Sequence, residues 1–266
     1  MGDAQFFTLW SSTVSAALGA IGGSAAAYFL TRQNDKTRHL RDEVTACNAA
    51  VGLCASIANT IIAIKRQQIK PMNDIYLAQC QSVQQAAVVP VGQPSVLQVN
   101  FDLNRMPTPW TCIDALNELI SSRITSAFEP SGLAPSLTQA IHNQQHFIEL
   151  RNALIEKFRG YNQNEKLARY FGISASPTEG ADRSYPDAMN GIVVYTDDCL
   201  YFASLLGDVL TAHANRLASQ LGDEAPPIKQ LNFKQLQADG LMPNPNGYAA
   251  FEKQYRPKKI ELFVTM

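Results

Sequence analysis

The chain has 266 residues, of which 17% are charged and 46% are hydrophobic, and its formal net charge at pH 7 is −1. This balance excludes a disordered acidic tail or basic arm. It also argues against a nucleic-acid-binding protein, which normally carries a strong basic excess.

The most distinctive feature is the segment from Phe6 to Leu30, which contains no charged residue. A helix of this length can cross a hydrocarbon core of roughly 30 Å, so we predict a single transmembrane helix at about 6–30 in a membrane anchor of residues 1–30. Positive residues favour the cytoplasm, which predicts the N-terminus outside and residues 31–266 in the cytoplasm. The topology-setting basic residues follow the segment directly and are Arg32, Lys36, Arg38 and Arg41.

Two other interpretations of this segment stay open. A cleaved signal peptide could use the alanine run at 25–27, but the basic n-region of such peptides is missing. A buried helix of a soluble protein is the other interpretation, because the segment is rich in Ala, Gly and Ser and only modestly apolar. We favour the membrane span, with the lipid bilayer as its partner.

One face of this segment carries only small residues at a spacing of four. Gly19 and Gly23 form the G-x-x-x-G pattern, which lets two helix backbones approach closely in lipid. The face predicts self-association of the transmembrane helix, although an Ala/Gly/Ser-rich span also contains such rows by chance. Its residues are Ser15, Gly19, Gly23 and Ala27.

Residues 31–88 read as a juxtamembrane helical stalk or hairpin. Apolar residues from Leu40 to Ile61 recur three and four apart, which is typical of a helix that buries one stripe. The helix is expected to stop at Pro71, and residues 73–87 are expected to form a shorter helix. The stripe is either a coiled-coil seam between chains or one edge of a bundle within one chain, and its small Ala, Cys and Val residues favour the bundle.

Residues 89–224 are expected to form a helical body with a small β element. The segment 97–103 alternates apolar and polar residues and predicts a strand, which needs a pairing partner at 87–91 or 260–265. Three helices are expected after it. They run from Thr108 to about Phe128, over about 135–159, and over about 187–221 with Gly222 just past the end.

Residues 225–266 form a Pro- and Asn-rich tail with one short helix at 233–238 and a basic stretch at 253–259. The predicted fold class is therefore mainly α, with a transmembrane helix, a helical-bundle cytoplasmic body and a small β element. The five cysteines are odd in number and contain no C-x-x-C pair, so neither a disulfide framework nor a structural zinc site is expected. Free thiols suit a reducing compartment.

Two groups of residues could carry chemistry. His142, His146 and Glu149 fall on one side of a helix and could hold a metal ion, although a solvated polar face explains the pattern more simply. His213 lies inside an apolar stripe, where a histidine is usually satisfied by a carbonyl or hydroxyl group. Phosphate-binding loops, dinucleotide-binding fingerprints and the common hydrolase and kinase motifs are absent, and we predict no cofactor.

These observations favour a single-pass membrane-anchored interaction or scaffold protein, with protein partners that the sequence does not identify. Two alternatives remain. One is a membrane-tethered metal-dependent hydrolase that uses His142 and His146. The other is a signalling subunit whose stalk transmits a signal from the membrane to the body.

Overall fold

The computed structural model describes the backbone of residues 3–86, 99–174, 180–249 and 251, and within these ranges the side chains from Ala27 onward. The described chain is mainly helical, as expected from the sequence. The elements are α1 (Asp3–Ile64), the π-turn η1 (Lys65–Ile69), α2 (Lys70–Ala86), α3 (Ile113–Arg123), α4 (Phe128–Phe158), α5 (Gln163–Phe171), α6 (Ser184–Leu221), η2 (Gly222–Glu224), α7 (Lys234–Ala238) and η3 (Pro245–Tyr248).

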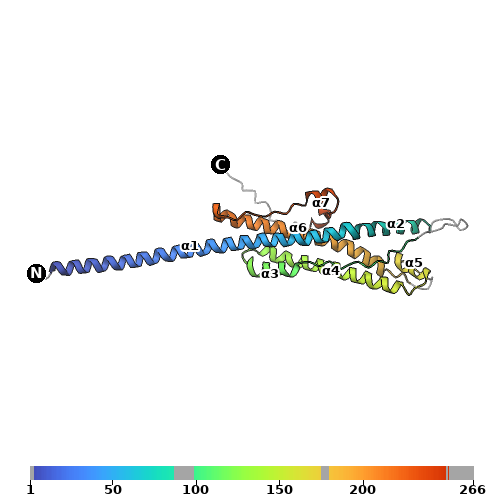
Figure 1. Ribbon diagram of the computed structural model, residues 1–266, viewed down its shortest axis with the longest axis horizontal. Coiled ribbons are helices and arrows are strands. Elements are labelled where there is room, and N and C mark those ends of the chain that lie inside the picture. The colour runs from blue at the N-terminus through green and yellow to red at the C-terminus, as the bar shows by residue number, and fades with distance from the viewer. Residues whose placement is uncertain (1–2, 87–98, 175–179, 250, 252–266) are drawn as a thin grey trace.

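The helix α1 is the longest described element, at 62 residues, and it belongs both to a projecting N-terminal rod and to the helical bundle. Its N-terminal part projects as a rod from an elongated bundle (Figure 1). Residues 27–42 of this rod are largely exposed, and burial begins at Glu43 and Val44. One continuous helix therefore contains both the uncharged N-terminal segment and a core element of the bundle.

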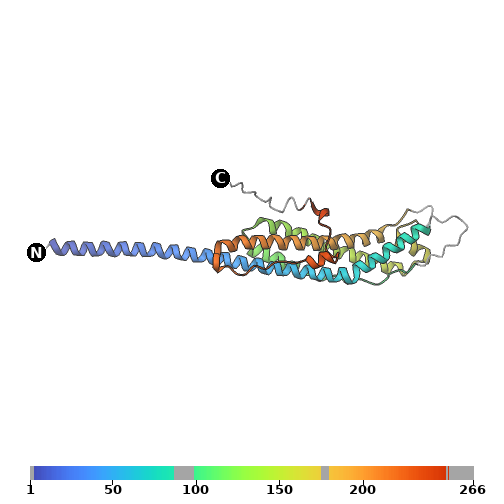
Figure 2. The same cartoon turned by 90° about the horizontal axis from the view of Figure 1, so that it is seen from above.

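The bundle is built on α6, which packs along α1 and along α4 (Figures 1 and 2). Arg41 pairs with Glu224 just past the end of α6, whereas Lys65 pairs with Asp197 nearer its start, so α1 and α6 are antiparallel. The apolar stripe of α1 is buried in this packing, which confirms the prediction of a bundle within one chain. Its fully buried members include Val44, Cys47, Cys54, Ala58 and Ile61.

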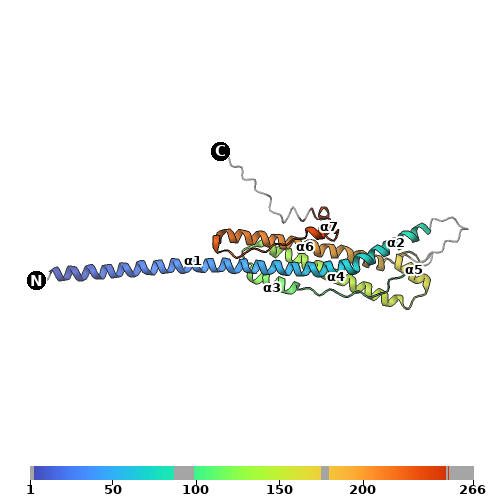
Figure 3. The ribbon, with the colours of Figure 1, turned by 45° about the horizontal axis from the view of Figure 1, so that its top comes forward.

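The short helix expected at 73–87 is confirmed by α2, but the expected stop at Pro71 is wrong, because the chain stays helical through η1 into α2 and on to Ala86. The π-turn at 65–69 starts a new helical direction, and Pro71 then occupies the first turn of α2. A proline is tolerated there, because a backbone N–H in the first turn has no partner within its own helix. Figure 3 shows α2 leaving the line of α1 at this point.

The helices of the body differ from the sequence prediction mainly at their starts. No helix begins at Thr108, since residues 99–112 form neither helix nor strand and α3 starts only at Ile113. The helix α4 begins at Phe128 rather than near 135, because Pro130 falls in its first turn. The prediction for α6 is confirmed to within three residues, and Gly222 follows it with a φ of 59°.

The predicted β element is wrong for the described part of the segment, because residues 99–103 form no strand. The described backbone bonds of these residues go to side chains of surrounding helices instead of to a second strand. Residues 97–98 and both proposed partner segments, 87–91 and 260–265, lie outside the described residues.

The C-terminal segment 225–248 returns along α1 and α6 as a strap (Figure 3). Asn48 of α1 donates to the carbonyl of Pro227 (2.9 Å), and Lys65 donates to the carbonyl of Leu241 (2.8 Å). A Cβ atom added at Gly207 of α6 would lie 2.1 Å from a methyl group of Leu231, so this glycine permits the close approach of the strap. The short helix α7 confirms the helix predicted at 233–238, and the basic stretch at 253–259 lies outside the described residues.

Within the described residues from Ala27 onward, one helical stretch, Ala27–Ala86, is long and apolar enough to cross a membrane. Half of its apolar window is buried inside the bundle, so this stretch is also a core helix. The side chains of most of the predicted span, 6–26, lie outside the described ones. All five cysteines are free, and burial raises the pKa of Cys47 and of Cys54 to about 12.

Candidate interaction groove

A groove of about 520 Å³ lies between the start of α2 and the extended segment 100–107. Gln67 and Gln68 of the π-turn line it on one side, together with Met72 and Ile75 of α2. The opposite wall is the extended segment itself, with the buried Arg151 of α4 behind it. π-Turns inside helices are frequent at functional sites, so the groove beside this turn is the candidate binding site.

Arg151 holds the middle of the extended segment. Its side chain is 1% exposed, and its guanidinium donates to the carbonyl groups of Asn104 (2.9 Å) and Asp102 (3.2 Å). The same guanidinium pairs with the Asp102 carboxylate at 3.2 Å. The Asp102 side chain is 31% exposed, but the guanidinium is buried, so losing these acceptors would leave its charge without partners, and Arg151 therefore holds the segment in place.

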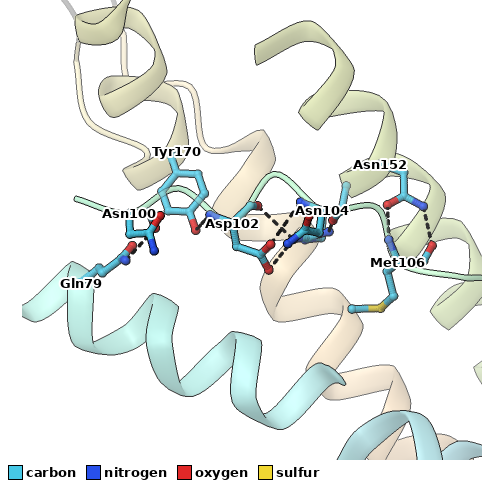
Figure 4. A network of polar contacts seen from close by, with 8 residues as sticks. Gln79, Asn100, Asp102, Asn104, Met106, Asn152 and Tyr170 are labelled. Carbon is cyan, nitrogen blue, oxygen red and sulfur yellow. Dashed lines mark hydrogen bonds and ion pairs between the residues drawn. The ribbon is translucent and has the colours of Figure 1, made fainter. Parts of the chain in front are cut away.

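Amide and hydroxyl side chains hold the rest of the segment (Figure 4). Asn152 accepts from the N–H of Met106 (2.9 Å) and donates to its C=O (2.8 Å), which copies the two bonds of a paired strand residue. The Tyr170 hydroxyl accepts from the N–H of Asp102 (3.4 Å), and Gln79 donates to the C=O of Asn100 (2.8 Å). The described backbone bonds of this segment therefore go to side chains rather than to a second strand.

An aromatic cluster lies beneath the segment and sets how closely the segment packs against the bundle. Phe101 packs edge-on against Tyr170 with ring centroids 5.1 Å apart, and Tyr170 stacks on Tyr185 at 4.5 Å. The Arg151 guanidinium lies 5.8 Å from the centre of the Tyr185 ring, within range of a cation–π interaction. Burial raises the pKa of both tyrosines above the ordinary value, so their hydroxyl groups stay neutral.

The residues predicted to bind a metal do not line this groove. His142, His146 and Glu149 are exposed on α4, and Glu149 lines a second cavity of about 630 Å³ on the other side of residues 105–107. Within the described residues, no three His, Cys, Asp or Glu side chains are close enough together to hold a metal ion. The metal-dependent hydrolase stays a prediction without support from the arrangement of these side chains.

The residues predicted to set topology and packing all lie on the rod of α1. Arg32, Lys36, Arg38 and Arg41 are exposed, and Arg41 pairs with Glu224 at 2.9 Å. Ala27 is also exposed. The backbone at Ser15, Gly19 and Gly23 is helical, but these side chains are outside the described ones, so self-association through this face stays a prediction.

A buried polar cluster at the point where α1 enters the bundle was not expected as a group. The Glu43 carboxylate accepts from the backbone N–H (3.1 Å) and the hydroxyl (2.7 Å) of Ser126, and it lies 3.2 Å from Nε2 of His213. Arg216 lies 2.7 Å from Nδ1 of the same ring. A guanidinium can only donate, so Nδ1 is the acceptor and Nε2 carries the hydrogen that faces Glu43.

This cluster links α1, the α3–α4 connection and α6. The position of His213 in an apolar stripe was the only sequence signal, and the expected hydroxyl partner is Ser126. Burial alone would raise the pKa of Glu43, but the hydrogen bonds from Ser126 and His213 outweigh it, so this pKa lies below its ordinary value. The carboxylate is therefore charged at neutral pH, although its side chain is 1% exposed.

No protein-family model, no curated protein and no solved structure matches this chain. The assignment of function therefore depends on the groove, the rod and the arrangement of the bundle alone.

Proposed function

We propose that this chain is a single-pass membrane-anchored interaction module, which presents the groove beside α2 at a fixed distance from the bilayer. The observation that carries the proposal is the continuity of α1 from Asp3 to Ile64. A flexible linker would leave the body free to turn, whereas this helix passes from the uncharged segment into the core of the bundle. An anchored module also raises the effective concentration of its partners near the membrane.

The exposed part of the rod supports a stand-off from the lipid. From Leu30 to Glu43, a rise of ~1.5 Å per residue gives a rod of roughly 20 Å between the end of the uncharged segment and the bundle. The side chains along this rod are mostly polar or charged and exposed, which suits the headgroup region and the water beyond it. The bundle would therefore lie clear of the hydrocarbon.

The orientation in this proposal places the N-terminus outside and residues 31–266 in the cytoplasm. The four basic residues that follow the span favour it. Five unpaired cysteines, three of them buried, suit a reducing interior.

Carbonate extraction of membranes from cells that express the full-length chain tests the anchor. The wild-type chain should stay with the membrane pellet. Ile21→Arg places a charge at the centre of the span, which costs about 2.5–3.5 kcal/mol, and should move a large part of the protein to the supernatant. The matched control is Gln33→Arg on the exposed rod, which should behave like the wild type. Release of the wild-type chain by carbonate would refute the proposal.

Cysteine labelling tests the orientation. In a background where the half-buried Cys80 and Cys112 are replaced by Ser, a membrane-impermeant maleimide added to intact cells should label Asp3→Cys, and should label Glu118→Cys on the exposed face of α3 only after lysis. The reverse pattern would leave the anchor in place but put the groove on the outer side.

A further inference from the structure

The π-turn η1 contacts both the groove and the C-terminal strap. Its residues 67–68 line the groove. The two residues before them contact the strap instead. Lys65 donates to the carbonyl of Leu241 (2.8 Å), and Arg66 pairs with the Asp239 carboxylate (3.2 Å). One turn of five residues therefore joins the strap to the wall of the groove.

The strap presents these two acceptors from a hydrogen-bonded turn at the end of α7. The N–H of Leu241 donates to the carbonyl of Leu236 (2.9 Å), and Gln235 donates to the Asp239 carboxylate (2.9 Å). Leu241 is also buried in the main hydrophobic core of the bundle. The first two residues of η1 are therefore held by groups that are themselves fixed to the bundle.

The backbone of η1 departs from α-helical geometry. The N–H of Lys70 bonds to the carbonyl of Lys65, five residues back, whereas in an α-helix it would bond to Arg66. Pro71 is a local reason for some break, because its ring in an uninterrupted α-helix would clash with the carbonyl of Gln67. A simple proline kink would also remove this clash, so Pro71 does not determine which direction α2 takes.

Beyond η1, the helix α2 is attached only near its start. Met72 and Tyr76 are its buried residues, and Tyr76 donates to the carbonyl of Tyr170 (3.2 Å). Residues 77–86 are exposed or half-buried. At ~1.5 Å per residue, Gln81 lies roughly 18 Å along α2 from the end of η1, so a change of about 20° in the direction of α2 moves it by about 6 Å.

We propose that the C-terminal strap is a clamp, which holds η1 in its π-turn and thereby sets the direction of α2 and the shape of the groove. When the strap is displaced, the contacts of Lys65 and Arg66 with it are lost and α2 pivots at η1. The strap and the groove are then coupled through one two-state element, so a partner that binds one of them alters the other. The inference rests on the proposed function only in taking the groove as the binding site.

Double electron–electron resonance measures the direction of α2 in the full-length chain in detergent micelles. Spin labels are attached at two exposed positions, Gln81→Cys on α2 and Lys157→Cys on α4. The half-buried Cys80 and Cys112 are replaced by Ser in this background. The labelled chain without further changes should give one narrow distribution of distances.

Lys65→Met tests the clamp, because it keeps the length of the side chain and removes the donor to the strap. It should shift or broaden the distance distribution by about 6 Å. The matched control is Lys70→Met at the start of α2, which loses only an exposed pair with Asp74 and should give the narrow distribution. A narrow, unshifted distribution in Lys65→Met would overturn the proposal.

A charge exchange separates the strap from α6, because Lys65 also pairs with Asp197 of α6. Arg66→Asp and Asp239→Arg each place like charges at the contact between η1 and the strap, so each should broaden the distribution. The two substitutions together restore opposite charges and should return the narrow distribution. A double variant as broad as the single variants would contradict the clamp.

Pro71→Ala tests the competing cause. It removes the ring but leaves the contacts with the strap, so the distribution should stay narrow and unshifted. A shift as large as that of Lys65→Met would show that the proline directs α2, and the proposal would fail. These distances depend neither on a partner in the groove nor on the membrane, so their outcome leaves the proposed function to be judged by carbonate extraction.

Discussion

At the scale of single residues, Glu43 shows how the entry of α1 into the bundle is fixed. A carboxylate that is almost fully buried costs folding free energy unless it is hydrogen-bonded. Ser126 supplies two donors and His213 lies opposite, and these groups come from parts of the chain 83 and 170 residues away. The position of the rod relative to the bundle therefore depends on this carboxylate.

The depressed pKa of Glu43 gives a stability contribution with a defined sign. The unfolded chain takes up its proton near the ordinary value of 4.5, whereas the folded chain does so at lower pH. The contribution is therefore complete above pH 4.5 and is lost as the pH falls through the folded pKa. We predict that Glu43→Gln lowers the free energy of unfolding at pH 7 by about 1–3 kcal/mol. The difference from the wild type should shrink below pH 4.5.

Urea unfolding of both proteins in detergent micelles, followed by circular dichroism at pH 7, 5 and 3.5, measures this difference. Glu118→Gln on the exposed face of α3 is the control, and it should change the free energy of unfolding little at any of these pH values. A loss in Glu43→Gln that is the same at every pH would show that the charge on the carboxylate plays no part.

At the scale of elements, the sequence predicted the helices of the bundle and failed at the extended segment. The helices α1 and α6 follow from periodic apolar stripes, which are local signals. Phe101 and Leu103 of the alternating segment pack against the aromatic cluster, but no strand forms at 99–103. Pairing was wrong because the partners are Arg151, Asn152 and Tyr170, which are 46 to 68 residues away on helices. No local pattern marks a side chain as a substitute for a strand.

The same reasoning explains why the groove was not predicted. It needs the π-turn at 65–69 to direct α2 away from the bundle axis, and π-turns have no reliable sequence signal. It also needs the extended segment to be held against α4 by non-local bonds. The residues that the sequence did single out on α4, His142 and His146, lie on its exposed face.

The pair of bonds from Asn152 to Met106 predicts how firmly the extended segment is held. Asn152→Ala leaves a buried N–H and a buried C=O without partners, which should lower the free energy of unfolding by about 1–3 kcal/mol. It should also free the adjacent peptide bond after Arg105 for cleavage by trypsin. Limited proteolysis with mass spectrometry measures the rate of this cleavage. The control is Asn190→Ala at an exposed position of α6, and equal rates in the two variants would show that Asn152 does not hold the segment.

At the scale of the whole molecule, the proposed anchor and the bundle share one helix, so in the proposed arrangement α1 determines how far the groove stands from the membrane. An anchor and a core element within one helix cannot move independently unless the helix bends. The polar cluster at Glu43, the pair of Arg41 with Glu224, and the strap bonded to Asn48 all hold α1 to the bundle. Among the residues whose side chains are described, 27–40 are the part of α1 that precedes these contacts and can bend before the bundle.

This arrangement predicts different effects for two insertions between Gln33 and Asn34. Seven residues of a helix-forming sequence add two turns, so they should move the bundle outward by about 10 Å while nearly preserving its facing direction. Four glycines should uncouple the bundle from the anchor, because each glycine destabilises the helical conformation by about 1 kcal/mol relative to alanine. The helix should therefore unwind and bend at the insertion. The mean distance should then change little, but its distribution should broaden.

Energy transfer in proteoliposomes distinguishes these outcomes. A donor dye is attached at Glu118→Cys, in a background where the half-buried Cys80 and Cys112 are replaced by Ser, and acceptor dyes are placed on lipid headgroups. A rigid rod gives one narrow distribution of donor lifetimes for the wild type, a narrow distribution at longer lifetime for the helical insertion, and a broad one for the glycine insertion. A wild-type distribution as broad as that of the glycine insertion would mean that the rod already bends, and that α1 does not hold the groove at a fixed height.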